Sequence, residues 1–135
     1  MFSVHIPRLP SSALNPNNQQ GKSWHAYAAA KKEDGEAALL CARQRRRAPG
    51  MPWTKVQVRV HFVIPYVKNP ARRDWDNLIA SCKGFWDGLV MADILVDDSM
   101  DVVRVIRFSM EHKQGHEGST IFEIEKLEQE ASNGR

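Results

Sequence analysis

Two aspartates one residue apart, Asp74 and Asp76, are the residues of this chain whose types and spacing best suit chemistry. In an extended lead-in to a helix, residues two apart point to the same side, so both carboxylates can face one ion while Trp75 faces away. Such a pair is half of a divalent-metal site. Helix capping also uses an aspartate, but one cap needs only one acid. The preceding Arg72 and Arg73 favour an anionic ligand.

The composition predicts one globular domain with a basic surface. A chain of 135 residues can bury a core without disulfides or a structural metal. The apolar fraction of 42% and the charged fraction of 26% exclude a disordered tail. A net charge of +3, with clustered basic residues, suits either a polyanion such as nucleic acid or a solvated face. The clusters are Arg43 with Arg45, Arg46 and Arg47, and Lys68 with Arg72 and Arg73.

The cysteines and the N-terminal segment indicate the compartment. Cys41 and Cys82 lie in apolar stretches, which favours reduced, buried thiols over a disulfide, and their spacing is not that of a zinc site. The first residues lack the long apolar stretch of a signal peptide, and no segment approaches the ~18 apolar residues of a membrane span. We therefore expect a cytoplasmic protein with no membrane partner.

Strict alternation marks residues 55–64 as the clearest strand. One face carries Val56, Val58, Val60, Phe62 and Ile64, and the other Lys55, Gln57, Arg59 and His61. Further strands are expected at 2–6, 102–110 and 120–127, and helices at 23–47 and 76–91. A glycine-bearing link at 111–119 predicts a hairpin between the last two strands. Together these elements predict an α+β fold: a single small domain with a mixed β-sheet of about four strands, in β-α-β-α-β-β order, and two main helices.

The helix expected at 76–91 places several charges on one stripe. At 100° per residue, Asp76, Lys83 and Asp87 fall at 0°, about 340° and about 20°. A charged stripe opposite an apolar face is also usual for a surface helix. The four-residue spacing of Lys83 and Asp87 permits an ion pair. Asp97 and Asp98 then bring two more acids to a turn before the next strand.

Over residues 3–127 the chain resembles the RusA-type Holliday junction resolvase family. The likeness is carried by Arg73-Asp74-Trp75-Asp76-Asn77, by Lys83 with Asp87, and by Asp97-Asp98-Ser99. It implies an endonuclease domain over 1–127, followed by a polar tail at 128–135. It also implies a homodimer, and catalytic Mg²⁺, with Mn²⁺ as a substitute, held by Asp74, Asp76 and Asp98.

One position departs from the family pattern. The family has a lysine one helical turn after its second aspartate, where this chain has Ala80. Lys83 restores the match if three residues were inserted into the early helix. Seven residues make nearly two full turns, so Lys83 stays on the face of Asp76.

The chemistry of phosphodiester hydrolysis agrees with this set of residues. Carboxylate-held hard cations make a nucleophile from water and neutralise charge on the phosphate. The expected function is therefore a magnesium-dependent, structure-selective endodeoxyribonuclease acting on branched DNA in recombination and repair. Asp74, Asp76 and Asp98 would hold metal, with Asp97 able to replace Asp98, and Lys83 would stabilise charge on the scissile phosphate. The expected DNA contacts are Arg72, Arg73, Lys83, Arg45, Arg46 and Arg47.

Two alternatives stay open. Asp98, Glu111 and Lys113 mimic the acid, acid-x-lysine pattern of restriction-type nucleases, although Lys113 is expected to lie past the end of its strand. The chain could also be a non-catalytic DNA-binding module in which the acids are only caps and turn formers. His61 is expected to be a surface residue of its strand, with a role as a ligand as the lesser alternative.

Overall fold

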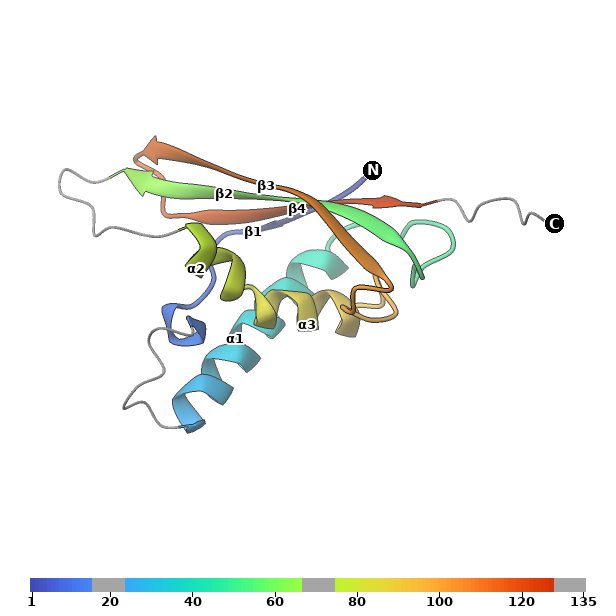
Figure 1. The fold of residues 1–135 in the computed structure, drawn as a ribbon, viewed down its shortest axis with the longest axis horizontal. Coiled ribbons are helices and arrows are strands. Elements are labelled where there is room, and N and C mark those ends of the chain that lie inside the picture. Colours follow the sequence, from blue (N-terminus) through green and yellow to red (C-terminus); the bar gives the residue numbers. More distant parts are fainter. Residues whose placement is uncertain (16–23, 67–74, 128–135) are drawn as a thin grey trace.

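The computed structural model describes residues 1–15, 24–66 and 75–127, and for Tyr66, Trp75 and Asp76 it describes the backbone only. One four-stranded sheet forms one layer, and the helices form a second layer against a single face of it (Figure 1). The expected polar tail at 128–135 lies outside the described residues.

The sheet is mixed, as predicted. Its strands are β1 (Phe2–Ile6), β2 (Val56–Tyr66), β3 (Val103–Gln114) and β4 (Ser119–Lys126). Their order in the sheet is β1-β4-β2-β3. β4 pairs antiparallel with both β1 and β2, whereas β3 pairs parallel with β2. The predicted α+β class, with one small domain and four strands, is confirmed.

The helices follow the predicted order, with one helix divided. They are α1 (Trp24–Arg43), α2 (Trp75–Ala80) and α3 (Lys83–Met91), and a short 3₁₀ turn, η1 (Ser12–Leu14), precedes α1. The single helix expected at 76–91 is wrong, because Ser81 and Cys82 form a turn between α2 and α3. There the Cys82 N–H donates to the Ile79 carbonyl at 3.2 Å, three residues back, which tightens the chain. No helix in the described ranges is both long and apolar enough to cross a membrane.

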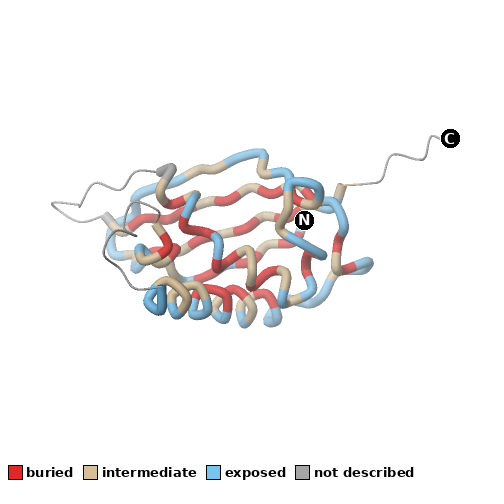
Figure 2. Tube along the Cα trace, turned by 60° about the horizontal axis from the view of Figure 1, so that its bottom comes forward, coloured by how far each residue is buried: buried red, intermediate tan, exposed pale blue. Residues whose placement is uncertain are grey.

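The core lies between the sheet and the helices. The alternation predicted in β2 is confirmed: Val56, Val58, Val60, Phe62 and Ile64 are all buried. Figure 2 shows buried positions recurring along the strands and along the inner sides of the helices. Phe122 of β4 meets Phe85 of α3 edge to face, with ring centroids 6.2 Å apart, and meets Trp86 at 4.9 Å. A fully buried phenylalanine contributes about 1.5–3 kcal/mol, so these rings fix the layers together.

The hairpin predicted between the last two strands is wrong. β3 and β4 are not neighbours, because β2 lies between them. A strand reached through a helical crossover joins its partner in parallel, so β3 occupies one edge of β2 and leaves the other to β4. β3 also runs to Gln114, beyond the expected end at Met110, because its backbone stays paired with β2 as far as Tyr66.

Glycines let α1 and α3 touch at their backbones. A Cβ added at Gly88 would lie 2.3 Å from the Gly35 carbonyl oxygen and 2.6 Å from the Ala38 Cβ. A Cβ at Gly84 would lie 2.8 Å from the Lys31 carbonyl oxygen. Gly35, which weakens the middle of α1 as an isolated helix, is therefore where α3 makes its closest approach.

A buried carboxylate joins the N-terminal segment to α1. The Asp34 side chain is 0% exposed, with its Oδ1 3.1 Å from the Arg8 guanidinium. Its Oδ2 accepts the Ser11 N–H at 2.8 Å. Burial raises the pKa of Asp34, while the Ser11 N–H and Arg8 act in the opposite direction. The charge is thus compensated by two partners from the segment after β1.

The two thiols are free, as predicted. Cys82 is buried and Cys41 is half-buried. Burial raises the pKa of both thiols, which keeps them protonated and unreactive near neutral pH.

Replacing Gly88 with alanine tests the helix contact. Gly88→Ala is expected to lower the free energy of unfolding by about 3 kcal/mol, because the new methyl group meets a backbone carbonyl that cannot turn aside. Urea denaturation followed by circular dichroism measures this. Gly115→Ala is the control: a Cβ there meets nothing within 4 Å, and only the φ of +74° opposes it, for about 1 kcal/mol. Equal losses for the two variants would contradict the backbone contact.

Candidate functional site

Four charged side chains form an alternating network between α1, α3 and the turn before β3. Lys83 Nζ lies 2.7 Å from Asp98 Oδ2 and 3.6 Å from Asp87 Oδ1. Lys31 Nζ lies 3.3 Å from Asp87 Oδ2. The ion pair predicted for Lys83 and Asp87 from their spacing is confirmed. The network also joins Lys83 to Asp98, two residues to which the resemblance assigns a role.

Backbone hydrogen bonds hold the chain after α3 in place and so position Asp98. The Trp53 N–H donates to the Ile94 carbonyl at 2.9 Å, and the Val96 N–H donates to the Trp53 carbonyl at 3.1 Å. Ser99 then closes a turn, with its carbonyl accepting the Val103 N–H at 2.9 Å. Asp97 and Asp98 lie between these two anchored points. The turn therefore holds Asp98 toward the N-terminus of α3.

Asp97 and Asp98 differ in what they face. Asp97 is exposed, and its Oδ1 accepts the Asp98 backbone N–H at 2.9 Å. The Asp98 side chain is 23% exposed and points to Lys83. Of these neighbours, Asp98 is the one directed into the network, and Asp97 stabilises the turn.

The Lys83–Asp98 contact favours the charged form of both groups. The hydrogen bond from Lys83 is the main cause that lowers the pKa of Asp98, and the same bond raises the pKa of Lys83. Both side chains remain partly exposed, so solvent weakens the pair. At neutral pH the site therefore presents an ionised carboxylate beside an ammonium group.

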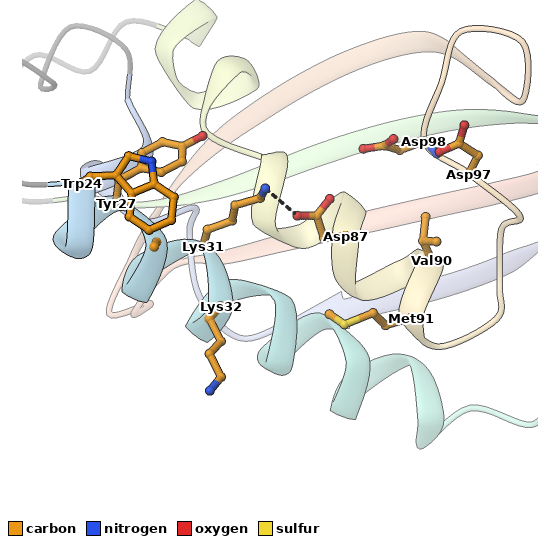
Figure 3. A pocket seen from close by; sticks show the side chains of 10 residues that line it. Trp24, Tyr27, Lys31, Lys32, Asp87, Val90, Met91, Asp97 and Asp98 are labelled. Carbon is orange, nitrogen blue, oxygen red and sulfur yellow. Dashed lines mark hydrogen bonds and ion pairs between the residues drawn. The ribbon is translucent and has the colours of Figure 1, made fainter.

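A cavity of about 560 Å³ opens beside this network, between the N-terminal half of α1 and α3 (Figure 3). One end carries Trp24 and Tyr27, and the other carries Asp97 and Asp98. The rest of the lining is Ala28, Lys31, Lys32, Asp87, Val90 and Met91.

The aromatic end of the cavity was missed by the sequence reasoning, which took the alanine-rich start of α1 only as a helix former. A signal was present, since Trp24, Tyr27, Ala28 and Lys31 are spaced i, i+3, i+4 and i+7 and share one helix face.

The predicted metal ligands are only partly described. Arg72, Arg73 and Asp74 lie outside the described residues, and Asp76 is described only as backbone, as the second residue of α2. Within the described ranges no group of three or more His, Cys, Asp or Glu side chains could hold a metal ion. Asp98 offers hard carboxylate oxygens of the kind that suit Mg²⁺, and the predicted ligand set would also need Asp74 and Asp76.

The predicted arginine contacts lie at the other end of α1. Arg45, Arg46 and Arg47 follow the helix, which ends at Arg43 and not at 47 as expected. The Arg45 guanidinium lies 5.9 Å from the centroid of the Phe2 ring, and Arg47 donates to the Met51 carbonyl at 2.8 Å. All three are exposed, and at 1.5 Å per residue Arg43 is about 18 Å along the axis from Lys31.

Glu111 belongs to a different cluster, on the sheet face opposite the helices. His61 Nδ1 lies 2.7 Å from Ser109 Oγ, and His61 Nε2 lies 3.0 Å from Glu111 Oε1. This partner lowers the pKa of Glu111. Lys113 lies inside β3, contrary to expectation, and Glu111 is about 26 Å along the strand from Val103 at 3.3 Å per residue. The geometry thus offers no support for a site that joins Asp98 to Glu111.

The ion pair generates a prediction about pH. The pKa of Asp98 is lowered in the folded protein, so its ion pair stabilises the fold at pH values above the ordinary aspartate pKa. This stabilisation is lost as the pH falls through the pKa that Asp98 has in the folded protein. Asp98→Asn should lower the free energy of unfolding by about 0.5–1 kcal/mol at pH 7, as a partly exposed pair does. Urea denaturation at pH 7 and pH 3 measures the difference, which should be smaller at pH 3.

The matched control for that experiment is Asp101→Asn, an exposed aspartate in the turn that leads into β3. It should change stability by less than about 0.5 kcal/mol at either pH. A loss for Asp98→Asn that is the same at both pH values would mean that the pair is not the cause.

Comparison with known proteins adds no relative to this picture. No protein-family model matches the chain, and no curated protein matches it either. What the protein does must therefore be inferred from the residues themselves and from the chemistry of the site.

Proposed function

We propose that this protein is a magnesium-dependent, structure-selective endodeoxyribonuclease that cleaves phosphodiester bonds in branched DNA, as in Holliday junction resolution during recombination and repair. The observation that carries the proposal is the meeting of Lys83 and Asp98 at 2.7 Å, fifteen residues apart in the chain, beside an open cavity. An ionised carboxylate next to an ammonium suits a site that handles a cation and a phosphate together.

Each residue has a role in this proposal. Asp98 would hold Mg²⁺ or Mn²⁺ together with Asp74 and Asp76. Such a cation activates water and neutralises charge on the phosphate. Lys83 would stabilise the charge that develops on the scissile phosphate, and Asp87, one helical turn later, holds the Lys83 side chain in place.

Further basic residues would position the DNA backbone. Arg72 and Arg73 precede the acidic pair in sequence, and Arg45, Arg46 and Arg47 offer exposed charge at the far end of α1. Phosphate contacts of this kind fix orientation and carry no sequence information. They would help the protein to select DNA by shape.

The active form is proposed to be a homodimer. Resolution of a four-way junction needs paired nicks in two strands, and one small domain offers one site. The resemblance to the RusA-type family implies the same arrangement.

A second candidate is a DNA-binding module without catalysis. It is favoured by the fact that each acid in the cavity lining has a structural partner: Asp87 has two lysines, Asp98 has Lys83, and Asp97 accepts a backbone N–H. In that case the acids stabilise the fold and only the basic surface meets DNA. Cleavage separates the two candidates.

The main test is cleavage of synthetic four-way junctions, flaps, forks and linear duplex in Mg²⁺. Wild type should cut branched DNA in preference to duplex. Asp98→Asn should lower the cleavage rate by at least ~100-fold, because a carboxylate that acts on the transition state is lost, and Lys83→Ala should act similarly.

Asp101→Asn and Lys113→Ala are the controls and should cut at wild-type rates. Circular dichroism checks that every variant is folded. DNA binding with no cleavage by wild type would favour the binding module. Loss of cleavage in Lys113→Ala, with Asp98→Asn active, would move the active site to β3.

Thermal melting tests the metal independently of DNA. Carboxylates gathered without a cation repel one another, so Mg²⁺ should raise the melting midpoint of wild type. At a Mg²⁺ concentration ten times the Kd, binding would stabilise the folded state by roughly 1.4 kcal/mol. This corresponds to a rise of about 5 °C in the melting midpoint. Asp76→Asn should lose most of this shift, and Asp101→Asn should keep it. Unchanged midpoints for wild type and Asp76→Asn alike would mean that these acids do not form a metal site.

A further inference from the structure

The cavity beside the Lys83–Asp98 pair has two chemically different ends. Trp24 and Tyr27 stand together at one end, and Figure 3 shows Asp97 and Asp98 at the other, with the Lys31–Asp87 ion pair between them. Its volume of about 560 Å³ is within the ~300–1,000 Å³ typical of small-ligand sites. A ligand that fits can therefore place a flat apolar part at the aromatic end and a charged part beside Lys31 and Lys32, the two lysines in the lining.

Trp24 is available to such a ligand. It is 75% exposed, which is unusual for the largest apolar side chain. Within the described residues its ring contact is with His25, edge to face, at 6.2 Å and an interplanar angle of 84°. An edge contact leaves the flat faces of the indole open. Together with Tyr27 it offers a stacking surface.

The lining carries two lysines and three aspartates, so a phosphate of the same ligand fits beside the lysines and away from the acidic end. Lys31 and Lys32 line the cavity and follow Tyr27 on α1, whereas Lys83 does not line it and is paired with Asp98 and Asp87. The first turn of α1 carries no acidic residue, so the positive end of its dipole is not offset there. A hydrophobic segment of a partner protein would instead bury Lys31, Asp87 and Asp98 without replacing their solvation.

We propose that this cavity takes one unpaired nucleotide of the branched DNA, with the base against Trp24 and Tyr27 and the adjoining phosphate toward Lys31 and Lys32. The inference rests on the proposed nuclease function and adds the part of the substrate that is recognised. A base inside a duplex is stacked on both faces and cannot present one to an indole, whereas an unpaired base at a branch point can. The site thus selects branched over linear DNA without reading sequence.

Photo-crosslinking tests this directly in wild-type protein without metal, so that no DNA is cut. A branched DNA carries one 5-iododeoxyuridine, either unpaired at the branch point or paired within an arm. Mass spectrometry of the digested protein should locate the adduct on Trp24 or Tyr27, with at least ten times the yield for the unpaired base. A tenfold excess of thymidine monophosphate should leave that yield unchanged.

Variants link the adduct to binding. Trp24→Ala should weaken binding of branched DNA by about five- to a hundredfold, as removal of one base-stacking ring does, and leave duplex binding unchanged. Trp24→Phe should retain most of the affinity. Leu40→Ala is the matched control, because Leu40 is 62% exposed on α1 and does not line the cavity.

Other outcomes overturn the inference in distinguishable ways. Equal adduct yields for paired and unpaired bases, or wild-type affinity in Trp24→Ala, would remove the unpaired-nucleotide site while leaving metal-dependent cleavage standing. Displacement by the mononucleotide would make the cavity a site for free nucleotides. Cleavage that survives in Asp98→Asn would remove the proposed nuclease site, yet the adduct would still report the cavity. Failure of wild type to bind any DNA would end both proposals.

Discussion

Backbone contact between α1 and α3 is the constraint on which the site depends. Glycines at positions 35, 84 and 88 let the two backbones approach closely, and a Cβ at Gly88 would lie only 2.3 Å from the Gly35 carbonyl oxygen. Lys31 extends from α1 and Asp87 from α3, and they meet at 3.3 Å because the helix axes are this close. The Lys31–Asp87 ion pair in the cavity therefore depends on the close glycine contact between the helices. Any larger residue at that contact would move α1 and α3, the two walls of the cavity, apart.

The alternating network would couple the two ligands of the proposed function, a phosphate and a cation. Lys31, Asp87, Lys83 and Asp98 balance one another in charge, so none of them is free to bind an ion without giving up a neighbour. A phosphate that drew Lys83 away would leave Asp98 without its partner, and a bound cation would offset that loss of positive charge. Substrate and cation would thus favour each other's binding, a linkage that comes from the arrangement of charges alone.

Sequence patterns predicted the helices and strands themselves better than they predicted which strands lie next to one another. β2 is evident from its alternation, because one face of that strand meets the core and the other does not. The pairing of β3 and β4 was wrong, because a short glycine-bearing link suggests a hairpin while the helical crossover after β2 decides which edge β3 joins. The division at Ser81 and Cys82 could not be foreseen either, since neither residue is a strong helix breaker.

The site was predictable to the extent that it follows helical spacing. Lys83 and Asp87 meet because they are one turn apart, and that geometry is local. Asp98 meets Lys83 only because the segment after α3 is pinned beside Trp53, which is a tertiary contact. The spacing of Trp24 and Tyr27 places them on one face of α1, but only the tertiary position of α3 opposite makes that face a wall of the cavity.

The buried Asp34 couples the unfolding of the segment after β1 to that of α1, the helix that forms one wall of the cavity. It adjoins Gly35 at the helix contact, and its two partners, Arg8 and Ser11, come from the chain just after β1. Detachment of that segment would leave the Asp34 carboxylate buried without its partners, which costs several kcal/mol. Local unfolding at this edge of the sheet is therefore suppressed. Amide hydrogens of β1 and of the middle of α1 should consequently exchange with solvent in a single cooperative event, at a rate set by the stability of the whole domain.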